Sequence, residues 1–388
     1  MPLTQAEQAA LSILQLMESR RLLPKEAWGL CRMMTMTLRP TASLVINVDN
    51  ILTARDAFAH KSIVGVDLED CLDEPLWFLK GAQLERLRIH QRWVVAPRDI
   101  AMPLGSMRVR DLLYDSAIPQ GGDTEWMSFV GTQLASVHRV IMRKCQVNFP
   151  ELPADIKCLD IWFCTFYSPM SLRSCVASQE SIKLSVTNLE YLLPYFSLCA
   201  KLRELTVVRV GIGSDGMGRD VVQPAVTWPA SLTNLELGYG NEHIVDLRFT
   251  PLPQGLQTLC LWSLVRLPEG YFPQSLKEVQ IALTGCRIPP SVLPASLHTL
   301  TLKASAQYKA GDPNPLATYP VGLKVLKFEC DDFPHPIGPL PQGLEALILP
   351  AKYSRRLGVL PAWSNSLTVP ERYPHPILTS AVISIYVR

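Results

Sequence analysis

The sequence predicts a repeat solenoid, in which similar turns stack so that their short strands form one parallel sheet. The first observation is a repeated phrase: PLPQGLQTLCL at 251–261 returns almost unchanged as PLPQGLEALIL at 339–349. The second is the content of 32 prolines in 388 residues. Because proline interrupts helices and inner strands, we expect many short elements joined by proline-bearing corners.

The phrase recurs in tandem between residues 228 and 349. Each copy has three apolar positions spaced L-x-x-L-x-L, and each has a proline three residues before the first of them. These first anchors are Leu232, Leu256, Leu276, Leu297, Leu323 and Leu344. Tandem self-similarity with a period of 20 to 26 residues is typical of solenoids. One such turn cannot bury its apolar face alone, which explains why the phrase recurs.

The pattern resembles the leucine-rich repeat. More narrowly, it resembles the short LP-x-S-L-x-x-L-x-L repeats of the FNIP type, which carry a Phe-Asn-x-Pro-Ile corner. Phe333–Ile337 (FPHPI) and Tyr373–Ile377 (YPHPI) match that corner except at the Asn position. The LP-x-x-L repeats of bacterial effectors are also similar. The resemblance implies a leucine-rich-repeat solenoid, horseshoe-like, with short parallel strands, few helices and a concave binding face.

The same interpretation extends the solenoid over residues 41–388, with its clearest repeats at 228–349. Upstream turns that keep the apolar triad begin at Leu84, Ile156 and Leu202. Looser candidates begin at Thr41, Ile63, Leu104, Val137 and Ser181. The longest insertion between turns is expected at 111–133, and a last strand at 382–387.

Residues 1–40 predict an N-terminal α-helical cap. Thr4 and Glu7 form a capping box, and Ala10, Leu14 and Met17 share one helical face. Leu23–Glu26 (LPKE) resembles the opening of an F-box. That resemblance implies an alternative role for this segment, the docking module of a ubiquitin-ligase substrate adaptor.

Composition favours a cytoplasmic protein, with a nuclear or organellar location left open. The ten cysteines include no CxxC pair, and a chain this long needs no disulfides, so we expect reduced thiols. The sequence contains no apolar run of about eighteen residues, so it predicts no membrane-spanning helix. The N-terminus lacks the basic leader and apolar core of a signal peptide.

No motif predicts catalysis, a cofactor, a metal or a small-molecule substrate. Residues 211–216 match GxGxxG, but Pro224 follows where a dinucleotide site needs a helix. His335 and His375 occupy equivalent proline-flanked corners. A metal pair is conceivable there, but repetition of a structural corner explains both. The sequence therefore predicts no enzyme.

The outward positions of the predicted sheet supply the candidate binding residues. A concave basic patch is expected from Arg86, Arg88, His90, Arg108, Arg110, Arg139 and Arg143. Arginine favours carboxylate or phosphate, so an acidic protein surface or RNA would suit this patch. Asp67 and Glu69 precede it and Asp160 follows it. These acids allow a second interpretation, a solvated ladder of weak ion pairs.

Two tryptophans follow their strand triads directly, Trp162 and Trp262. Each is either an exposed binding aromatic or a cover for the sheet. The sequence thus predicts a non-enzymatic scaffold for protein–protein interaction, a subunit of a larger assembly. The alternatives are the F-box-like adaptor and an RNA- or ribonucleoprotein-binding protein.

Overall fold

The computed structural model confirms a parallel β-solenoid. It describes residues 43–47, 63–69, 79, 81–91, 108–116, 126–128, 137–144, 146–148, 155–166, 177–186, 196–209, 227–239, 245–246, 251–262, 265–266, 270–283, 293–304, 316, 318–361, 365–377 and 384–387. The chain divides into two compact units, Met1–Ser178 and Gln179–Arg388.

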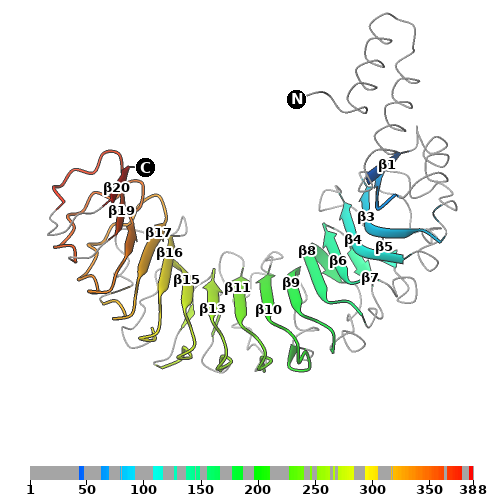
Figure 1. Ribbon diagram of the computed structural model, residues 1–388, viewed down its shortest axis with the longest axis horizontal. Helices are drawn as coiled ribbons and strands as arrows, with labels where there is room; N and C mark the ends of the chain where they lie inside the picture. The colour runs from blue at the N-terminus through cyan, green and yellow to red at the C-terminus, as the bar shows by residue number, and fades with distance from the viewer. Residues whose placement is uncertain are drawn as a thin grey trace, which may run out of the picture. The chain divides into compact units, whose positions relative to one another are not determined.

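The first unit contains one long parallel sheet and one short one (Figure 1). The long sheet consists, in order, of β1 (Ser43–Asn47), β2 (Gly65–Glu69), β3 (Gln83–Gln91), β4 (Arg108–Ser116), β6 (Arg139–Arg143) and β8 (Cys158–Phe166). The short sheet joins β5 (Trp126–Ser128), β7 (Gln146–Asn148) and the end of β8.

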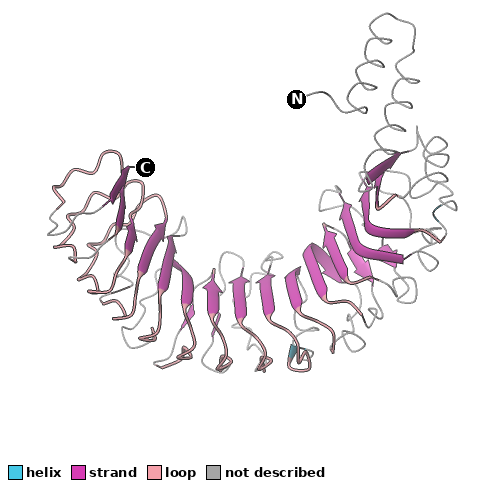
Figure 2. Cartoon of the chain, in the orientation of Figure 1, coloured by secondary structure: helices cyan, strands magenta, loops and turns pink. Residues whose placement is uncertain are grey.

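The second unit is also a parallel sheet, and helix is nearly absent from its described residues (Figure 2). Its strands are β9 (Ser181–Val186), β10 (Glu204–Arg209), β11 (Asn234–Tyr239), β13 (Thr258–Leu261), β15 (Glu278–Leu283), β16 (Thr299–Ala304), β17 (Val325–Glu329), β18 (Ala346–Ile348), β19 (Ser366–Val369) and β20 (Ser384–Val387). A separate pair joins β12 (Val245–Asp246) to β14 (Val265–Arg266).

The apolar anchors form the core, as predicted. In the turn of β16, Leu297, Leu300 and Leu302 are all fully buried, whereas His298 between them is exposed. Sheet pairing places Leu300 beside Val279 on one side and Leu326 on the other. Each fully buried leucine contributes about 1.5–3 kcal/mol through removal of apolar surface from water.

The proline of the repeat closes a four-residue turn before each strand. The amide of Leu297 donates to the carbonyl of Pro294 over 3.1 Å, and Leu256 donates to Pro253 in the same way. A carbonyl accepting from the amide three residues later is the bond of a β-turn. The fixed proline-to-leucine spacing in the sequence therefore reflects one repeated turn.

Two predicted anchors in the upstream half are wrong. The turn of β4 is anchored at Val109, with Leu112 and Tyr114 buried, and not at Leu104. The predicted insertion at 111–133 is wrong for the same reason, since 111–116 belong to β4. In the turn of β9 the first anchor is the buried Gln179, followed by Ile182 and Leu184, rather than Ser181. A glutamine at an apolar position concealed this triad.

The proline-histidine corners are structural, and there is a third corner between them. Tyr353 stacks on Tyr373 with ring centroids 6.3 Å apart. The amide of Ile337 donates to the hydroxyl of Tyr353, and that of Leu357 to the hydroxyl of Tyr373. The corner at 353–357 was not predicted because its sequence, YSRRL, lacks both prolines.

Both corner histidines pack edge-on against an aromatic ring, His335 on Phe333 and His375 on Tyr373. A ring nitrogen of His375 also lies 2.9 Å from the carbonyl oxygen of Ser354. These contacts give both histidines a place in the corner itself.

Several predictions fall outside the described residues: the N-terminal helical cap at 1–40, its F-box-like segment, and the glycine-rich segment at 211–216. The predicted last strand is present as β20. In the part of the chain that the structure describes, no helix is long and apolar enough to cross a membrane.

Candidate binding surface

The outward face of the first unit is organised as three rows that run across β2, β3, β4, β6 and β8. Neighbours in a row lie on adjacent strands, about 4.8 Å apart. The first row is Gly65, Arg86, Asp111, Arg139 and Cys158; the second is Asp67, Arg88, Leu113, Ile141 and Asp160; the third is Glu69, His90, Asp115, Arg143 and Trp162.

This register corrects the predicted basic patch. Arg108 pairs with Gln83, so neither Arg108 nor Arg110 lies beside Arg88 and His90. The places expected for them belong to Leu113 and Asp115. The error follows from the wrong anchor, because a shift of five residues along β4 moves every side chain of that strand to another row.

Acidic and basic side chains therefore alternate on this face. Among the residues in these rows, five are acidic (Asp67, Glu69, Asp111, Asp115 and Asp160) and four are arginines (Arg86, Arg88, Arg139 and Arg143). A surface of mixed sign does not suit a run of phosphates, which requires clustered positive charge. It suits a protein partner with charges of both signs.

The charges are close but mostly not paired. The Nδ1 atom of His90 lies 4.0 Å from a carboxylate oxygen of Asp115. Burial raises the pKa of Asp67 above its ordinary value, and the positive charges of Arg88 and Arg86 partly oppose this rise. The side chains of Arg88 and Arg143 form no ion pair with another described residue.

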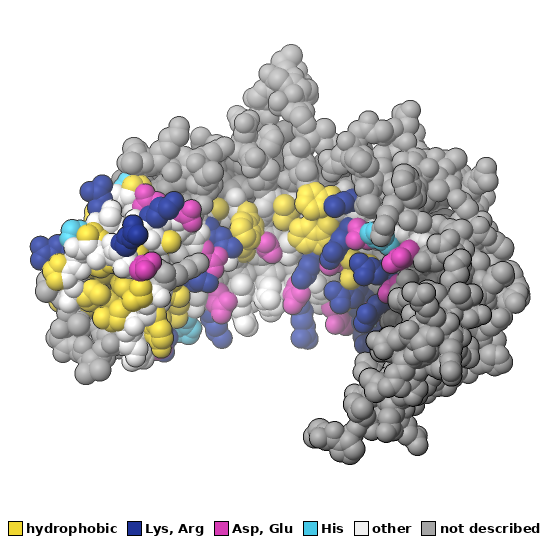
Figure 3. All heavy atoms as spheres, turned by 90° about the horizontal axis from the view of Figure 1, so that it is seen from above, with side chains coloured by type: hydrophobic (Ala, Val, Ile, Leu, Met, Phe, Trp, Pro, Cys, Tyr) yellow, Lys and Arg dark blue, Asp and Glu magenta, His cyan; other side chains and the backbone are white. Residues whose placement is uncertain are grey.

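An apolar centre lies within this charged face, and we define it as Leu113, Ile141, Trp162 and Phe163. Leu113 pairs with Ile141 across β4 and β6, and both side chains are partly exposed although they occupy outward positions. The rings of Trp162 and Phe163 have centroids 6.5 Å apart. Figure 3 shows hydrophobic side chains on this face beside basic, acidic and histidine side chains.

A bulge turns Phe163 outward. Trp162 and Phe163 are two consecutive side chains outside the core, between the buried Ile161 and Cys164. Phe163 has a φ of 56°, and Lys144, which follows β6 at the aligned position, has a φ of 54°. A left-handed backbone is costly for a bulky residue, and such outliers concentrate at functional sites. The side chain of Phe163 is 47% exposed as a result.

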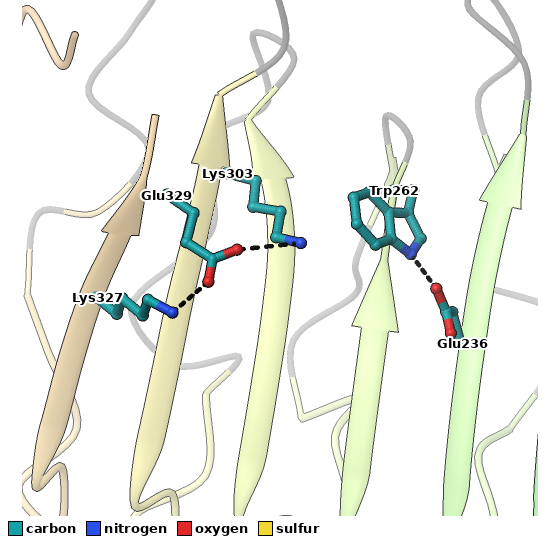
Figure 4. A network of polar contacts seen from close by, with 5 residues as sticks. All are labelled: Glu236, Trp262, Lys303, Lys327 and Glu329. Carbon is teal, nitrogen blue, oxygen red and sulfur yellow. Dashed lines mark hydrogen bonds and ion pairs between the residues drawn. The ribbon is translucent and has the colours of Figure 1, made fainter. Parts of the chain in front are cut away.

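Trp262 in the second unit belongs to a different arrangement, a chain of contacts across the strands (Figure 4). Its Nε1–H donates to Glu236 on β11 over 2.5 Å, and the Nζ of Lys303 on β16 lies 3.9 Å from the ring centroid. Lys303 also pairs with Glu329 at 3.1 Å, and Glu329 contacts Lys327. The hydrogen bond from Lys327 and then that from Lys303 lower the pKa of Glu329.

The neighbouring strand makes room for this tryptophan. A side chain at Gly238 would meet the Cβ and Cδ1 of Trp262 at 3.4 Å. The Nε1–H of Trp262 already donates to Glu236, and Lys303 already lies over one face of its ring. Of the two roles predicted for Trp262, these contacts favour a cover for the sheet over an exposed binding aromatic. The ring nevertheless keeps 41% of its surface exposed.

Within the described ranges, no three side chains of His, Cys, Asp and Glu gather as metal ligands would. The predicted site residues thus separate into three places. Arg86, Arg88, His90, Arg139, Arg143 and Trp162 share the outward face of the first unit; Arg108 and Arg110 lie where β4 begins; Trp262 lies in the second unit.

The sequence did not reveal Leu113 and Phe163 as surface residues, whereas Ile141 lies between Arg139 and Arg143, which were predicted to face outward. Apolar residues in an apolar strand are expected to lie in the core. Only the register of β4 places Leu113 outside the core, and only the bulge in β8 does so for Phe163.

These strands, their register and their leucine columns make the chain a solenoid of leucine-rich-repeat-like turns. No protein-family model matches the chain, and no curated protein matches its sequence. Among solved structures, it is similar to CroV588, a circular leucine-rich-repeat protein, with 15% identity and a TM-score of 0.47. The similarity covers 89% of this chain and 55% of CroV588, so the chain spans little more than half of that protein's length.

Proposed function

We propose that the protein is a non-enzymatic scaffold that binds another protein through the outward face of its first unit. The observation that carries the proposal is the apolar centre within a face of charges of both signs, on which Arg88 and Arg143 form no ion pair with another described residue. Protein interfaces have this composition, an aromatic and aliphatic core within a polar rim. Trp162 and Phe163 supply the aromatic anchors, and Arg139 and Arg143 supply rim charges.

The wider setting that we propose is an intracellular, reducing compartment and a place in a larger assembly. Cys158, Cys164, Cys199, Cys260 and Cys330 form no disulfide with one another. The corners at 333–337 and 373–377 support the FNIP-type resemblance.

The test replaces one outward isoleucine on each unit. Ile141 on β6 and Ile348 on β18 occupy the same position, between the second and third apolar anchors of their turns, and both are partly exposed. We expect Ile141→Asp to reduce capture of a specific partner at least about tenfold in affinity purification with quantitative mass spectrometry. We expect Ile348→Asp to leave that capture unchanged.

Thermal unfolding of both variants shows whether each remains folded. If the two folded variants capture the same proteins in the same amounts as wild type, the first unit's face is not the binding surface. Equal loss in both variants would also contradict the proposal.

A further inference from the structure

A basic edge borders the apolar centre where the strands of the first unit begin. We define it as Arg108, Arg110, His138, Arg139 and Lys157, all of which are exposed. The backbone places three of them side by side: the amide of His138 donates to the carbonyl of Arg110, and that of Lys157 to the carbonyl of His138. Arg110 on β4, His138 just before β6 and Lys157 just before β8 therefore follow one another across the sheet.

This edge is more uniform in sign than the outward face. Glu85 lies at one end, since the pairs Leu84–Val109 and Arg86–Asp111 place it beside Arg110, and Asp155 lies two residues before Lys157. Arg108, Arg110 and Arg139 form no ion pair with another described residue. Asp111 lies beside Arg139 on β4, so the five basic side chains of this edge have three acidic neighbours, Glu85, Asp111 and Asp155.

We propose that the basic edge and the apolar centre together bind an extended acidic segment of the partner protein. This inference rests on the proposed function, because it uses the same apolar centre as anchor. Carboxylates of the partner would lie at Arg110 and Arg139, and an apolar side chain of the same segment would lie on Leu113 and Ile141. Arginine binds carboxylate in two-pronged geometry, which favours an acidic peptide at this edge.

The spacing along the strands defines the segment. Ile141 follows Arg139 by two residues and Leu113 follows Arg110 by three. At about 3.3 Å per residue, the edge and the centre are roughly 7–10 Å apart. In an extended peptide, side chains two residues apart point the same way and are about 6.6 Å apart. The motif is therefore an acidic residue two positions from an apolar residue.

The experiment selects peptides from a displayed library of random sequences of about twelve residues, an extended length of roughly 40 Å. The full-length protein is the target, and the double variant Arg110→Glu, Arg139→Glu is used for counter-selection. Arg203→Glu, at an exposed arginine of the second unit, is the matched control. Selected peptides are then measured by fluorescence anisotropy, beside an oligouridylate of similar length.

We expect enriched peptides with Asp or Glu two positions from Leu, Ile, Phe or Trp. Their affinity should fall at least about tenfold with the double variant and remain unchanged with Arg203→Glu. Enriched peptides without acidic residues, or binding unaffected by the double variant, would overturn the inference. So would an oligouridylate that binds more tightly than the peptides and loses affinity with the same variant.

The two proposals fail in different ways. If selected peptides lose affinity with Ile141→Asp but not with the double arginine variant, the binding face stands and the acidic segment is wrong. If neither variant changes the binding of any selected peptide, both proposals are wrong.

Discussion

Cys260 shows how position on the sheet decides the reactivity of one residue. It is an outward residue of β13, with Glu236 and Gln280 beside it on the neighbouring strands. Burial, and then the negative charge of Glu236, raise the pKa of its thiol to about 12, although Lys303 opposes the rise. Because the thiolate is the nucleophile, a pKa this high makes a thiol a poor nucleophile near neutral pH.

We predict that Cys260 resists alkylation in the folded protein. At pH 8 a thiol of pKa about 12 is ionised in roughly one molecule in ten thousand, whereas an unfolded cysteine is ionised in about a quarter. Iodoacetamide should therefore label Cys260 at least about a hundredfold more slowly in buffer than in urea, as measured by mass spectrometry of its peptide. The urea sample is the control. Native labelling within about tenfold of the urea rate would contradict the prediction.

At the scale of the element, the residue before each anchor joins one turn to the previous one. It is Ser231, Gly255, Ser275, Ser296, Gly322 and Gly343 in the six clear repeats. Where it is serine, its hydroxyl donates to a backbone carbonyl of the preceding turn: Ser231 to Leu202 at 2.8 Å, Ser275 to Leu256 at 2.6 Å and Ser296 to Gln274 at 2.6 Å. Where it is glycine, the distance to the preceding turn differs from turn to turn.

Gly322 and Gly343 make a matched pair for substitution by alanine. A Cβ at Gly322 would lie 2.2 Å from the carbonyl oxygen of Ala295, whereas a Cβ at Gly343 would lie 3.5 Å from the carbonyl oxygen of Val321. We predict that Gly322→Ala lowers the free energy of unfolding by about 1–3 kcal/mol, because backbone must move. Gly343→Ala should raise it by about 0.4–1 kcal/mol, since alanine restricts the unfolded chain.

Urea unfolding followed by circular dichroism measures both variants against wild type. Equal effects of the two substitutions, or a stabilising Gly322→Ala, would show that the turns do not approach as closely as described.

At the scale of the molecule, tyrosines that are wholly or partly buried make stability depend on alkaline pH. Burial raises the pKa of Tyr271, Tyr319, Tyr353 and Tyr373, all in the second unit, above the ordinary tyrosine value. A group whose pKa is higher when folded contributes stability that is fully present below its unfolded pKa, here about 10. That contribution is lost as the pH rises further, because ionisation then favours the unfolded chain.

We predict that the urea midpoint is lower at about pH 10.5–11 than at about pH 8. Cys260 adds to the loss in the same direction, from about pH 9 upward. Tyr319→Phe should make the dependence shallower, because it removes one of the tyrosines whose pKa is raised most. The same midpoint at both pH values would contradict this account of the buried hydroxyls.

The repeat itself could be predicted from the sequence. A proline and an apolar triad at fixed spacing specify a turn and an inward-facing strand, and both depend only on residues near one another in the chain. The turns at Leu232 to Leu344 therefore match the structure anchor by anchor. The turn of β9 does not, because Gln179 takes a place where the pattern expects an apolar residue.

The binding face depended on information that local sequence does not contain. Leu104 and Val109 can each begin an apolar triad, and only pairing of β4 with β3 and β6 selects Val109. That choice places Asp111 and Asp115 among the arginines and sends Arg108 and Arg110 to the basic edge. The outward turn of Phe163 likewise depends on a bulge aligned with Lys144.

The sequence by itself determined that this protein stacks leucine-rich turns, because hydrophobic periodicity and turn chemistry act over a few residues. The tertiary structure decided which charges are neighbours and which apolar side chains face outward. The physical reason is that side chains on adjacent strands come together through sheet pairing, across twenty or more residues of chain, and one shifted anchor rearranges all of them.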